Sequence, residues 1–241
     1  MKLCICYLVQ FVIALSSLSL ASFAADVQAL HGFFESDHQH IGFDEYRRQA
    51  QPASPAILIL HGSGGLSSHN FPYAELAHRL ALSGFVVIVP HYLDATNRSS
   101  QNAETKYKKW VKVIEDALAY LGTKPYIKKD RIAILGFSLG ASVALAAASE
   151  GLRFAAVVEC AGSLPDEYFY HLRAMPPVLI LHNTLDPVVP VYNARRLQSL
   201  CEAKKFSCQL VIGSGGQHGL PAPEDRSLHE IESFLAMHLH S

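Results

Sequence analysis

The most informative segment of the chain is Gly136-Phe137-Ser138-Leu139-Gly140, which has the form G-x-S-x-G. It follows the apolar run 131–135 and precedes the alanine-rich segment 139–149. A serine between a buried strand and a helix can occupy a sharp turn that exposes its hydroxyl, and the flanking glycines let strand and helix approach closely. The segment therefore predicts a nucleophile elbow with Ser138 at its tip. A structural serine flanked by glycines is the alternative interpretation.

Short apolar runs without polar alternation recur along the chain and alternate with helical patterns. Such runs are typical of parallel strands that are buried on both faces. They occupy residues 56–60, 85–89, 131–135, 155–158, 178–181 and 208–212. The helical patterns occupy residues 71–83, 106–121, 139–149, 192–204 and 227–240, and segments 32–36 and 41–47 could form an opening antiparallel hairpin. The alternation predicts an α/β fold with a doubly wound, mostly parallel sheet flanked by helices.

The N-terminus has the three parts of a secretory signal peptide. Met1-Lys2 is basic, residues 3–20 are almost all apolar or small, and Ser22-Phe23-Ala24 has the small-x-small form of a cleavage site. We expect residues 1–24 to be removed and residues 25–241 to form a single catalytic domain of an exported, periplasmic or secreted protein. A permanent signal anchor is the alternative. After this segment no apolar stretch reaches the roughly 18 residues of a membrane span, so no mature transmembrane helix is expected.

The composition excludes several classes of protein. Of the 241 residues, 50% are hydrophobic and 17% are charged, which excludes an intrinsically disordered chain. The formal net charge of −1 at pH 7 offers no basic excess for binding nucleic acid. The sequence has no His-Glu-x-x-His or Cys-x-x-Cys pattern for zinc, although His38 and His40 could bind a metal weakly. We therefore expect neither a metal nor a cofactor, and the oligomeric state stays open.

Three of the five cysteines lie beyond the predicted signal peptide, and an exported protein can contain disulfides. Cys201 and Cys208 form the more favourable pair, because a helix end and the following strand could bring them together. Cys160 would then be a free thiol. Three buried thiols are the alternative interpretation.

A glycine-rich segment, His61-Gly62-Ser63-Gly64-Gly65, follows the predicted buried strand at residues 56–60. Acyl transfer needs preorganised donors for the negatively charged oxygen of the tetrahedral intermediate. In this type of site the donors are the backbone N–H groups of the residue after the nucleophile and of the loop after an early strand. We therefore predict that the N–H groups of Leu139 and Ser63 bind the oxyanion, with Gly64 as the alternative to Ser63. His61 could brace this loop. A nucleotide-binding loop is not favoured, because the third glycine of G-x-G-x-x-G and the Gly-Lys-Ser/Thr of a P-loop are missing.

A serine nucleophile needs a base, and the base needs an orienting carboxylate. His218 lies in a glycine-rich loop directly after the last predicted strand, where its imidazole could reach over the edge of the sheet. Asp186 follows the next-to-last predicted strand, at the end where open α/β sheets place ligands. Glu159, at the end of the preceding strand, is the second candidate acid, and Asp166 is expected to belong to a turn or helix cap. We predict that Ser138, His218 and Asp186 form a catalytic triad.

Four segments together resemble the dienelactone hydrolase-like branch of the α/β-hydrolase superfamily. They appear in that family's order and approximate spacing, and the likeness extends from about Ala56 to the C-terminus. The segments are Asp130-Arg131-Ile132 with the G-x-S-x-G elbow, His61-Gly62-Ser63-Gly64-Gly65, Asp186-Pro187-Val188-Val189-Pro190 and Gln217-His218-Gly219. The resemblance implies an eight-stranded, mostly parallel sheet and a hydrolytic triad. The namesake enzymes carry Cys where this chain has Ser138, so a general serine esterase fits this residue better than a dienelactone hydrolase.

The sequence predicts a serine hydrolase, and most favourably a carboxylesterase that acts on small soluble esters through an acyl-enzyme intermediate. The segment 160–177 is too short for an inserted lid domain. The polar connection 92–105 could shape the pocket, with Tyr92 and Arg98 as candidate substrate-binding residues. The alternatives on the same fold are a dienelactone hydrolase-like lactonase, a peptidase, a thioesterase or an acyltransferase. The alternative of a different class is a non-catalytic binding protein that retains the fold.

Overall fold

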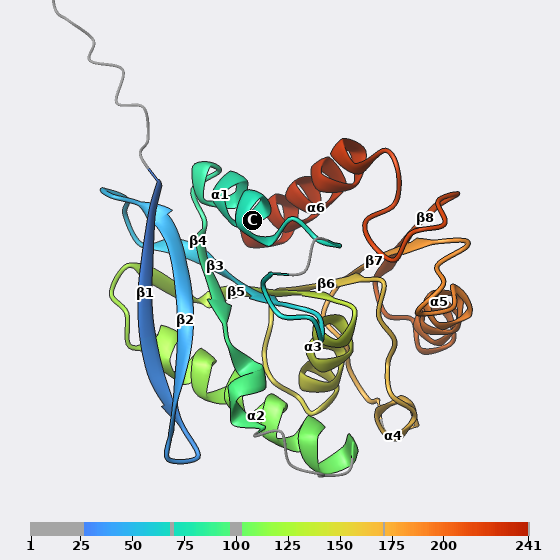
Figure 1. Cartoon of the computed structure of the whole chain (residues 1–241), viewed down its shortest axis with the longest axis horizontal. Coiled ribbons are helices and arrows are strands. Elements are labelled where there is room, and N and C mark those ends of the chain that lie inside the picture. Colours follow the sequence, from blue (N-terminus) through green and yellow to red (C-terminus); the bar gives the residue numbers. More distant parts are fainter. Residues whose placement is uncertain (1–26, 68–69, 97–102, 171, 241) are drawn as a thin grey trace, which may run out of the picture.

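The computed structural model describes residues 27–67, 70–96, 103–170 and 172–240 (Figure 1). The predicted signal peptide and Arg98 lie outside these residues. An eight-stranded sheet crosses this part of the chain in the order β1-β2-β4-β3-β5-β6-β7-β8. Helices cover both of its faces (Figure 1), so the predicted α/β architecture is confirmed.

The parallel part of the sheet begins at its third position. The strands are β1 (Val27–Ser36), β2 (Gln39–Arg48), β3 (Ser54–Leu60), β4 (Val86–Pro90), β5 (Ile127–Phe137), β6 (Ala156–Cys160), β7 (Val178–Asn183) and β8 (Cys208–Gly213). β1 and β2 form the predicted hairpin, and β2 pairs antiparallel with β4. The remaining neighbours pair in parallel. Strands β3, β4, β6 and β7 are buried over their whole length, which explains their continuous apolar sequences.

The helices divide into two layers. They are α1 (Tyr73–Leu82), the 3-10 helix η1 (Tyr92–Ala95), α2 (Ala103–Gly122), α3 (Leu139–Ser149), α4 (Asp166–Phe169), α5 (Tyr192–Lys204) and α6 (Glu224–Leu239). α1 and α6 pack in one apolar cluster on one face, and α2, α3 and α5 pack in a second cluster on the other (Figure 1). The five predicted helices agree with the structure to within a few residues, whereas η1 and α4 are too short for a periodic pattern. Within the described residues, none of the helices combines the length and apolar character needed to cross a membrane.

The parallel arrangement determines where the sequence motifs meet. The carboxyl ends of parallel strands lie at one edge of a sheet, and open α/β sheets place their ligands there. The glycine-rich loop follows β3, the elbow follows β5, and the acidic and histidine-containing loops follow β7 and β8. The candidate site is therefore assembled from turns that are far apart in the chain.

The predicted disulfide is present between Cys201 in α5 and Cys208 in β8. It closes the short connection between this helix and the edge strand. Cys160 at the end of β6 is a free and buried thiol.

Candidate active site

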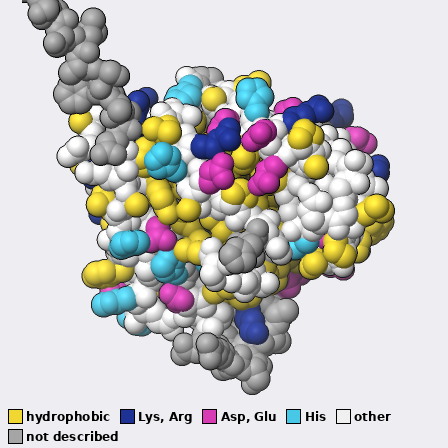
Figure 2. All heavy atoms as spheres, turned by 45° about the horizontal axis from the view of Figure 1, so that its top comes forward, with side chains coloured by type: hydrophobic (Ala, Val, Ile, Leu, Met, Phe, Trp, Pro, Cys, Tyr) yellow, Lys and Arg dark blue, Asp and Glu magenta, His cyan; other side chains and the backbone are white. Residues whose placement is uncertain are grey.

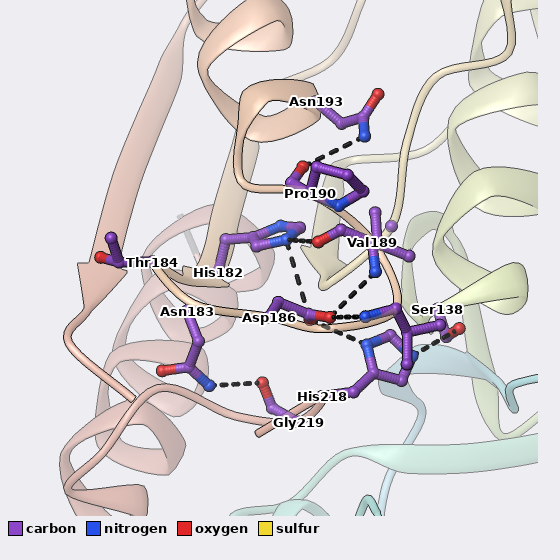
Figure 3. A network of polar contacts seen from close by, with 12 residues as sticks. Ser138, His182, Asn183, Thr184, Asp186, Val189, Pro190, Asn193, His218 and Gly219 are labelled. Carbon is purple, nitrogen blue, oxygen red and sulfur yellow. Dashed lines mark hydrogen bonds and ion pairs between the residues drawn. The ribbon is translucent and has the colours of Figure 1, made fainter. Parts of the chain in front are cut away.

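Ser138 lies at the tip of the turn between β5 and α3, as the sequence predicts. Its φ of 53° and ψ of −119° fall outside the ordinary regions for a residue with a side chain, at a cost on the order of 1–3 kcal/mol. The Ser138 N–H donates to the carbonyl oxygen of Cys160 at 2.8 Å, which ties the turn to β6. The strained turn directs the serine side chain toward His218 (Figure 3).

The two glycines of the elbow are required for space rather than for backbone freedom. A Cβ atom at Gly140 would overlap the carbonyl group of Leu60 at the end of β3. A Cβ atom at Gly136 would overlap the backbone of Gly140 and Ala141. Neither glycine has a positive φ. The G-x-S-x-G pattern therefore reflects the close approach of β3, β5 and the start of α3.

Ser138, His218 and Asp186 form one connected chain of hydrogen bonds (Figure 3). His218 Nε2 lies 2.8 Å from Ser138 Oγ, and His218 Nδ1 lies 2.8 Å from Asp186 Oδ2. The Asp186 side chain is fully buried, and only 9% of the His218 side chain is exposed. The three predicted triad residues are thus brought together in the order that base-activated nucleophilic attack requires.

The Asp186 carboxylate is held as an anion by donors on both of its oxygens. Oδ2 meets His218, and Oδ1 accepts the N–H groups of Val188 and Val189 at 2.8 and 2.9 Å. Burial alone would raise the pKa of Asp186, but these hydrogen bonds outweigh it and hold the pKa below its usual value. The carboxylate is therefore ionised at neutral pH and can stabilise an imidazolium on His218.

The second candidate acid, Glu159, is buried behind the elbow. One carboxyl oxygen accepts the N–H of Gly162, and in the described part of the chain the other has no hydrogen-bond partner. Burial raises the pKa of Glu159 to about 8, although the Gly162 N–H opposes this rise. Glu159 is therefore a mostly neutral acid at pH 7, unlike Asp186. Asp166, the predicted turn or cap residue, is the first residue of α4 and pairs with Arg196.

The glycine-rich loop after β3 is held by two tyrosines. The Gly62 N–H donates to the Tyr73 hydroxyl at 2.8 Å, and the Tyr92 hydroxyl donates to the His61 carbonyl oxygen at 2.7 Å. Tyr92 is completely buried, so the prediction that it contacts substrate is wrong: its side chain supports the loop from the core. The His61 ring packs against Tyr92 and braces the loop as expected. The prediction for Arg98 falls outside the described residues.

The two segments that carry the predicted oxyanion donors adjoin Ser138. The loop lies next to Ser138, because a Cβ built on Gly62 would be 3.4 Å from the Ser138 Cβ. Ser63 and Gly64 are exposed at this loop. Leu139 is the first residue of α3, where a backbone N–H has no intrahelical acceptor. Leu139 and Ser63, or Gly64, therefore stay the predicted donors to an oxygen bound beside Ser138.

A groove of about 1230 Å³ opens beside the glycine-rich loop. Its described lining is His61, Ser63, Gly64, Gly65, Leu66, Ser67, His91, Leu93, Asp94 and Thr96. Imidazole, hydroxyl and carboxylate groups thus alternate with two leucines. Asp94 supplies the carboxylate of this described lining.

Histidine side chains gather on the surface near β1 and β2 (Figure 2). His31 and His40 of this hairpin are exposed and pair with Asp44 and Glu35. Across the residues that the structure describes, no three His, Cys, Asp or Glu side chains are arranged to hold a metal ion.

Two polar residues at the end of β7 were not predicted from the sequence to support the site. His182 Nε2 donates to the Val189 carbonyl oxygen at 2.8 Å and lies 3.8 Å from Asp186 Oδ2 (Figure 3). The adjacent Asn183 donates to the loop that carries His218. Both side chains are completely buried. The signal that could have found them is a polar pair that ends an otherwise apolar strand, because buried polar groups need hydrogen-bond partners.

Solved structures with low sequence identity share this fold. A dienelactone hydrolase-like promiscuous phosphotriesterase from metagenomic libraries superposes with a TM-score of 0.72 at 18% identity, over 88% of this chain and 98% of the other. A structure from a study of two fungal esterases from Rhizomucor miehei superposes with a TM-score of 0.73 at 16% identity, over 89% and 85% of the two chains. At these identities the similarity shows the fold alone.

The sequence itself is related to a curated protein and to a described family. It is 32% identical over 161 residues to acyl-coenzyme A thioesterase 1 of Mus musculus, and the match covers 63% of this chain. The matched region spans only 36% of the length of that relative. The model of the dienelactone hydrolase family matches residues 43–236. This range includes the elbow, the glycine-rich loop, the loops of Asp186 and His218 and most of the sheet. The chain therefore belongs to the dienelactone hydrolase family.

Proposed function

We propose that this protein is a serine hydrolase that cleaves small soluble carboxylic esters. The observation that carries the proposal is the hydrogen-bonded chain from Ser138 through His218 to the ionised Asp186. Membership of a hydrolase family supports it. The strained conformation of Ser138 supports it as well, because residues with such backbone strain cluster at active sites, where the surrounding structure holds them.

In the proposed reaction, His218 Nε2 takes the Ser138 proton as Oγ attacks the ester carbonyl carbon. Asp186 holds the imidazole tautomer and stabilises the imidazolium. The N–H groups of Leu139 and Ser63, or Gly64, donate to the oxyanion. His218 then protonates the departing alcohol, and a water molecule that it activates releases the acid from Ser138.

The test uses p-nitrophenyl acetate and butyrate with the purified protein. We expect release of p-nitrophenol by the native protein and a loss of at least about 1000-fold in kcat/KM for Ser138→Ala. Ser233→Ala, in the exposed face of α6, is the matched control and is expected to retain the native rate. Full activity in the Ser138→Ala variant would contradict the proposal, and a native protein without activity toward esters, amides or thioesters would favour a binding role.

A thioesterase is the second candidate, because the curated relative carries that name. The same triad could attack a thioester. The carboxylate of Asp94 in the described groove lining disfavours a leaving group that carries phosphates. We expect a neutral S-ethyl thioester to be cleaved faster than the acetyl thioester of coenzyme A; the opposite order would favour a thioesterase that acts on acyl-coenzyme A. A lactone and a dipeptide amide, assayed beside them, distinguish the lactonase and peptidase alternatives.

We also propose that the protein is exported and cleaved after Ala24. The signal-like N-terminus and the disulfide between Cys201 and Cys208 support this proposal, because disulfides persist in oxidising compartments. N-terminal sequencing of the protein recovered from the extracellular or periplasmic fraction tests it, with a mature start at Ala25 as the expected result. Recovery of the uncleaved chain in the cytoplasmic fraction would contradict it.

A further inference from the structure

Asn183, the last residue of β7, binds the loop that carries His218. Its side chain is completely buried. Its Nδ2 lies 3.1 Å from the carbonyl oxygen of Gln217, 3.3 Å from that of Gly219 and 3.2 Å from that of Leu220. Figure 3 shows the contact with Gly219. One amide therefore contacts the main chain on both sides of His218.

The chemistry around Asn183 fixes the orientation of its amide. A rotation of the amide by 180° would place Oδ1 against three carbonyl oxygens. In the observed orientation Oδ1 faces Gly213 and Gly215 instead, and a Cβ atom at either glycine would lie 2.7 Å from it. The two glycines thus leave just enough room for this oxygen. In this orientation Nδ2 can donate only to the loop that carries His218. Because the site is buried, water does not compete for the carbonyl groups.

The neighbouring residue performs the corresponding task for the acidic loop. Side chains of successive strand residues point to opposite faces of a sheet, so His182 and Asn183 reach different loops from one place. His182 binds the carbonyl group of Val189, in the segment that donates to Asp186. The end of β7 therefore contacts the loop of Asp186 and the loop of His218 through adjacent side chains.

We propose that Asn183 is a positioning residue that holds His218 within reach of Ser138. The inference rests on the proposed function, because it assigns His218 the role of general base. Asn183 does not touch the reacting atoms and acts through the main chain of residues 217–220. A misplacement of about 1 Å at a reacting group can cost about 100-fold in rate. We therefore expect the loss of these hydrogen bonds to lower the rate at least tenfold.

A double-mutant cycle with His218 separates positioning from a general structural role. The four proteins are the native chain, Asn183→Ala, His218→Ala and the double variant, and kcat and KM are measured with p-nitrophenyl acetate. We expect Asn183→Ala to lower kcat at least tenfold with KM changed less than about threefold. In the His218→Ala background the same substitution should change the residual rate less than about twofold, because the base that it positions is gone. Asn193→Ala is the matched control, since Asn193 makes one exposed amide hydrogen bond, to Pro190, and should retain the native kcat.

Two results would overturn the inference. One is a native kcat in Asn183→Ala, and the other is an equal loss in both backgrounds, which would mean that Asn183 supports the scaffold and not the base. Circular dichroism and thermal unfolding establish that each variant is folded. If Asn183→Ala does not accumulate as folded protein, Asn183→Leu is used in the same cycle, because leucine keeps the branched shape of the side chain and removes the hydrogen-bond donor.

The rate of Ser138 modification by a fluorophosphonate, followed by intact mass, separates this inference from the proposed function. If the native protein is not modified, the proposed function fails. If the native protein and Asn183→Ala are modified equally fast, the proposed function stands and the positioning role of Asn183 is wrong.

Discussion

His182 Nε2 lies 2.8 Å from the carbonyl oxygen of Val189, and both residues adjoin the carboxylate of Asp186 (Figure 3). Val189 also donates its N–H to Asp186. The His182 imidazole therefore holds the peptide segment that positions the Asp186 carboxylate. We expect His182→Leu to lower kcat/KM about tenfold and the free energy of unfolding by about 1–3 kcal/mol. Ester hydrolysis and urea unfolding measure the two effects. His229→Leu, which alters an exposed histidine of α6, should leave both unchanged.

The same substitution should alter the acid sensitivity of the fold. Burial lowers the pKa of His182 below its usual value of 6.5, although its hydrogen bond to Val189 opposes this. Below pH 6.5 the unfolded chain binds a proton that the native imidazole does not, so the native protein loses stability as the pH falls toward the lowered pKa. We expect His182→Leu to lose less free energy of unfolding between pH 7 and 5 than the native protein. An identical pH dependence in the two proteins would mean that His182 is not buried in its neutral form.

Gly140→Ala should prevent the elbow from forming. The added Cβ would overlap the carbonyl group of Leu60, and a backbone clash between β3 and α3 has no flexible side chain to relieve it. We expect a loss of at least about 3 kcal/mol in the free energy of unfolding, together with loss of ester hydrolysis. Gly122→Ala, at the end of α2, is the matched control, because its Cβ would meet no atom within 4 Å. A Gly140→Ala variant with native stability would show that β3 and α3 can separate without cost.

Glu159→Gln should make the protein more resistant to alkaline conditions. Burial raises the pKa of Glu159 from about 4.5 to about 8, so between these values the native state holds a proton that the unfolded chain has lost. The stabilising effect of this proton is complete below pH 4.5 and declines as the pH rises, by at most about 1.4 kcal/mol per pH unit. Glutamine keeps the shape without this titration. Urea unfolding at pH 5, 7 and 9 measures the free energy of unfolding. This free energy should rise for Glu159→Gln relative to the native protein as the pH increases. Glu202→Gln, which alters an exposed residue, should show the same pH dependence as the native protein.

The disulfide between Cys201 and Cys208 should stabilise the fold by about 2–3 kcal/mol, the entropic value for a short closed loop. We expect a reductant to lower the free energy of unfolding of the native protein by this amount. The Cys201→Ala/Cys208→Ala double variant should be insensitive to the same treatment. Cys160→Ala should retain the sensitivity, because Cys160 takes no part in the disulfide. An equal response of native protein and double variant would contradict this prediction.

The sequence by itself determined the class of fold and the positions of the chemistry. Strands buried on both faces are apolar over most of their length, so their positions in the chain can be recognised in the sequence. The glycines beside Ser138 are likewise local consequences of a tight turn, and Asp186 and His218 follow strands whose ends share one edge of the sheet. These features depend on neighbours in the chain or on the general geometry of a parallel sheet.

Only the tertiary structure decided which polar groups meet. Ser138 and His218 are 80 residues apart, and His218 and Asp186 are 32 apart, so no local pattern reports their hydrogen bonds. Glu159 is the second candidate acid in the sequence, but its burial behind the elbow favours the protonated form. Tyr92 was expected in the pocket wall and lies in the core. The polar pair at the end of β7 suggests that Asn183 needs a hydrogen-bond partner, but the sequence does not say that this partner is the His218 loop. The physical reason is that desolvation and hydrogen bonding depend on every segment that packs around a group, and the chain order does not specify those neighbours.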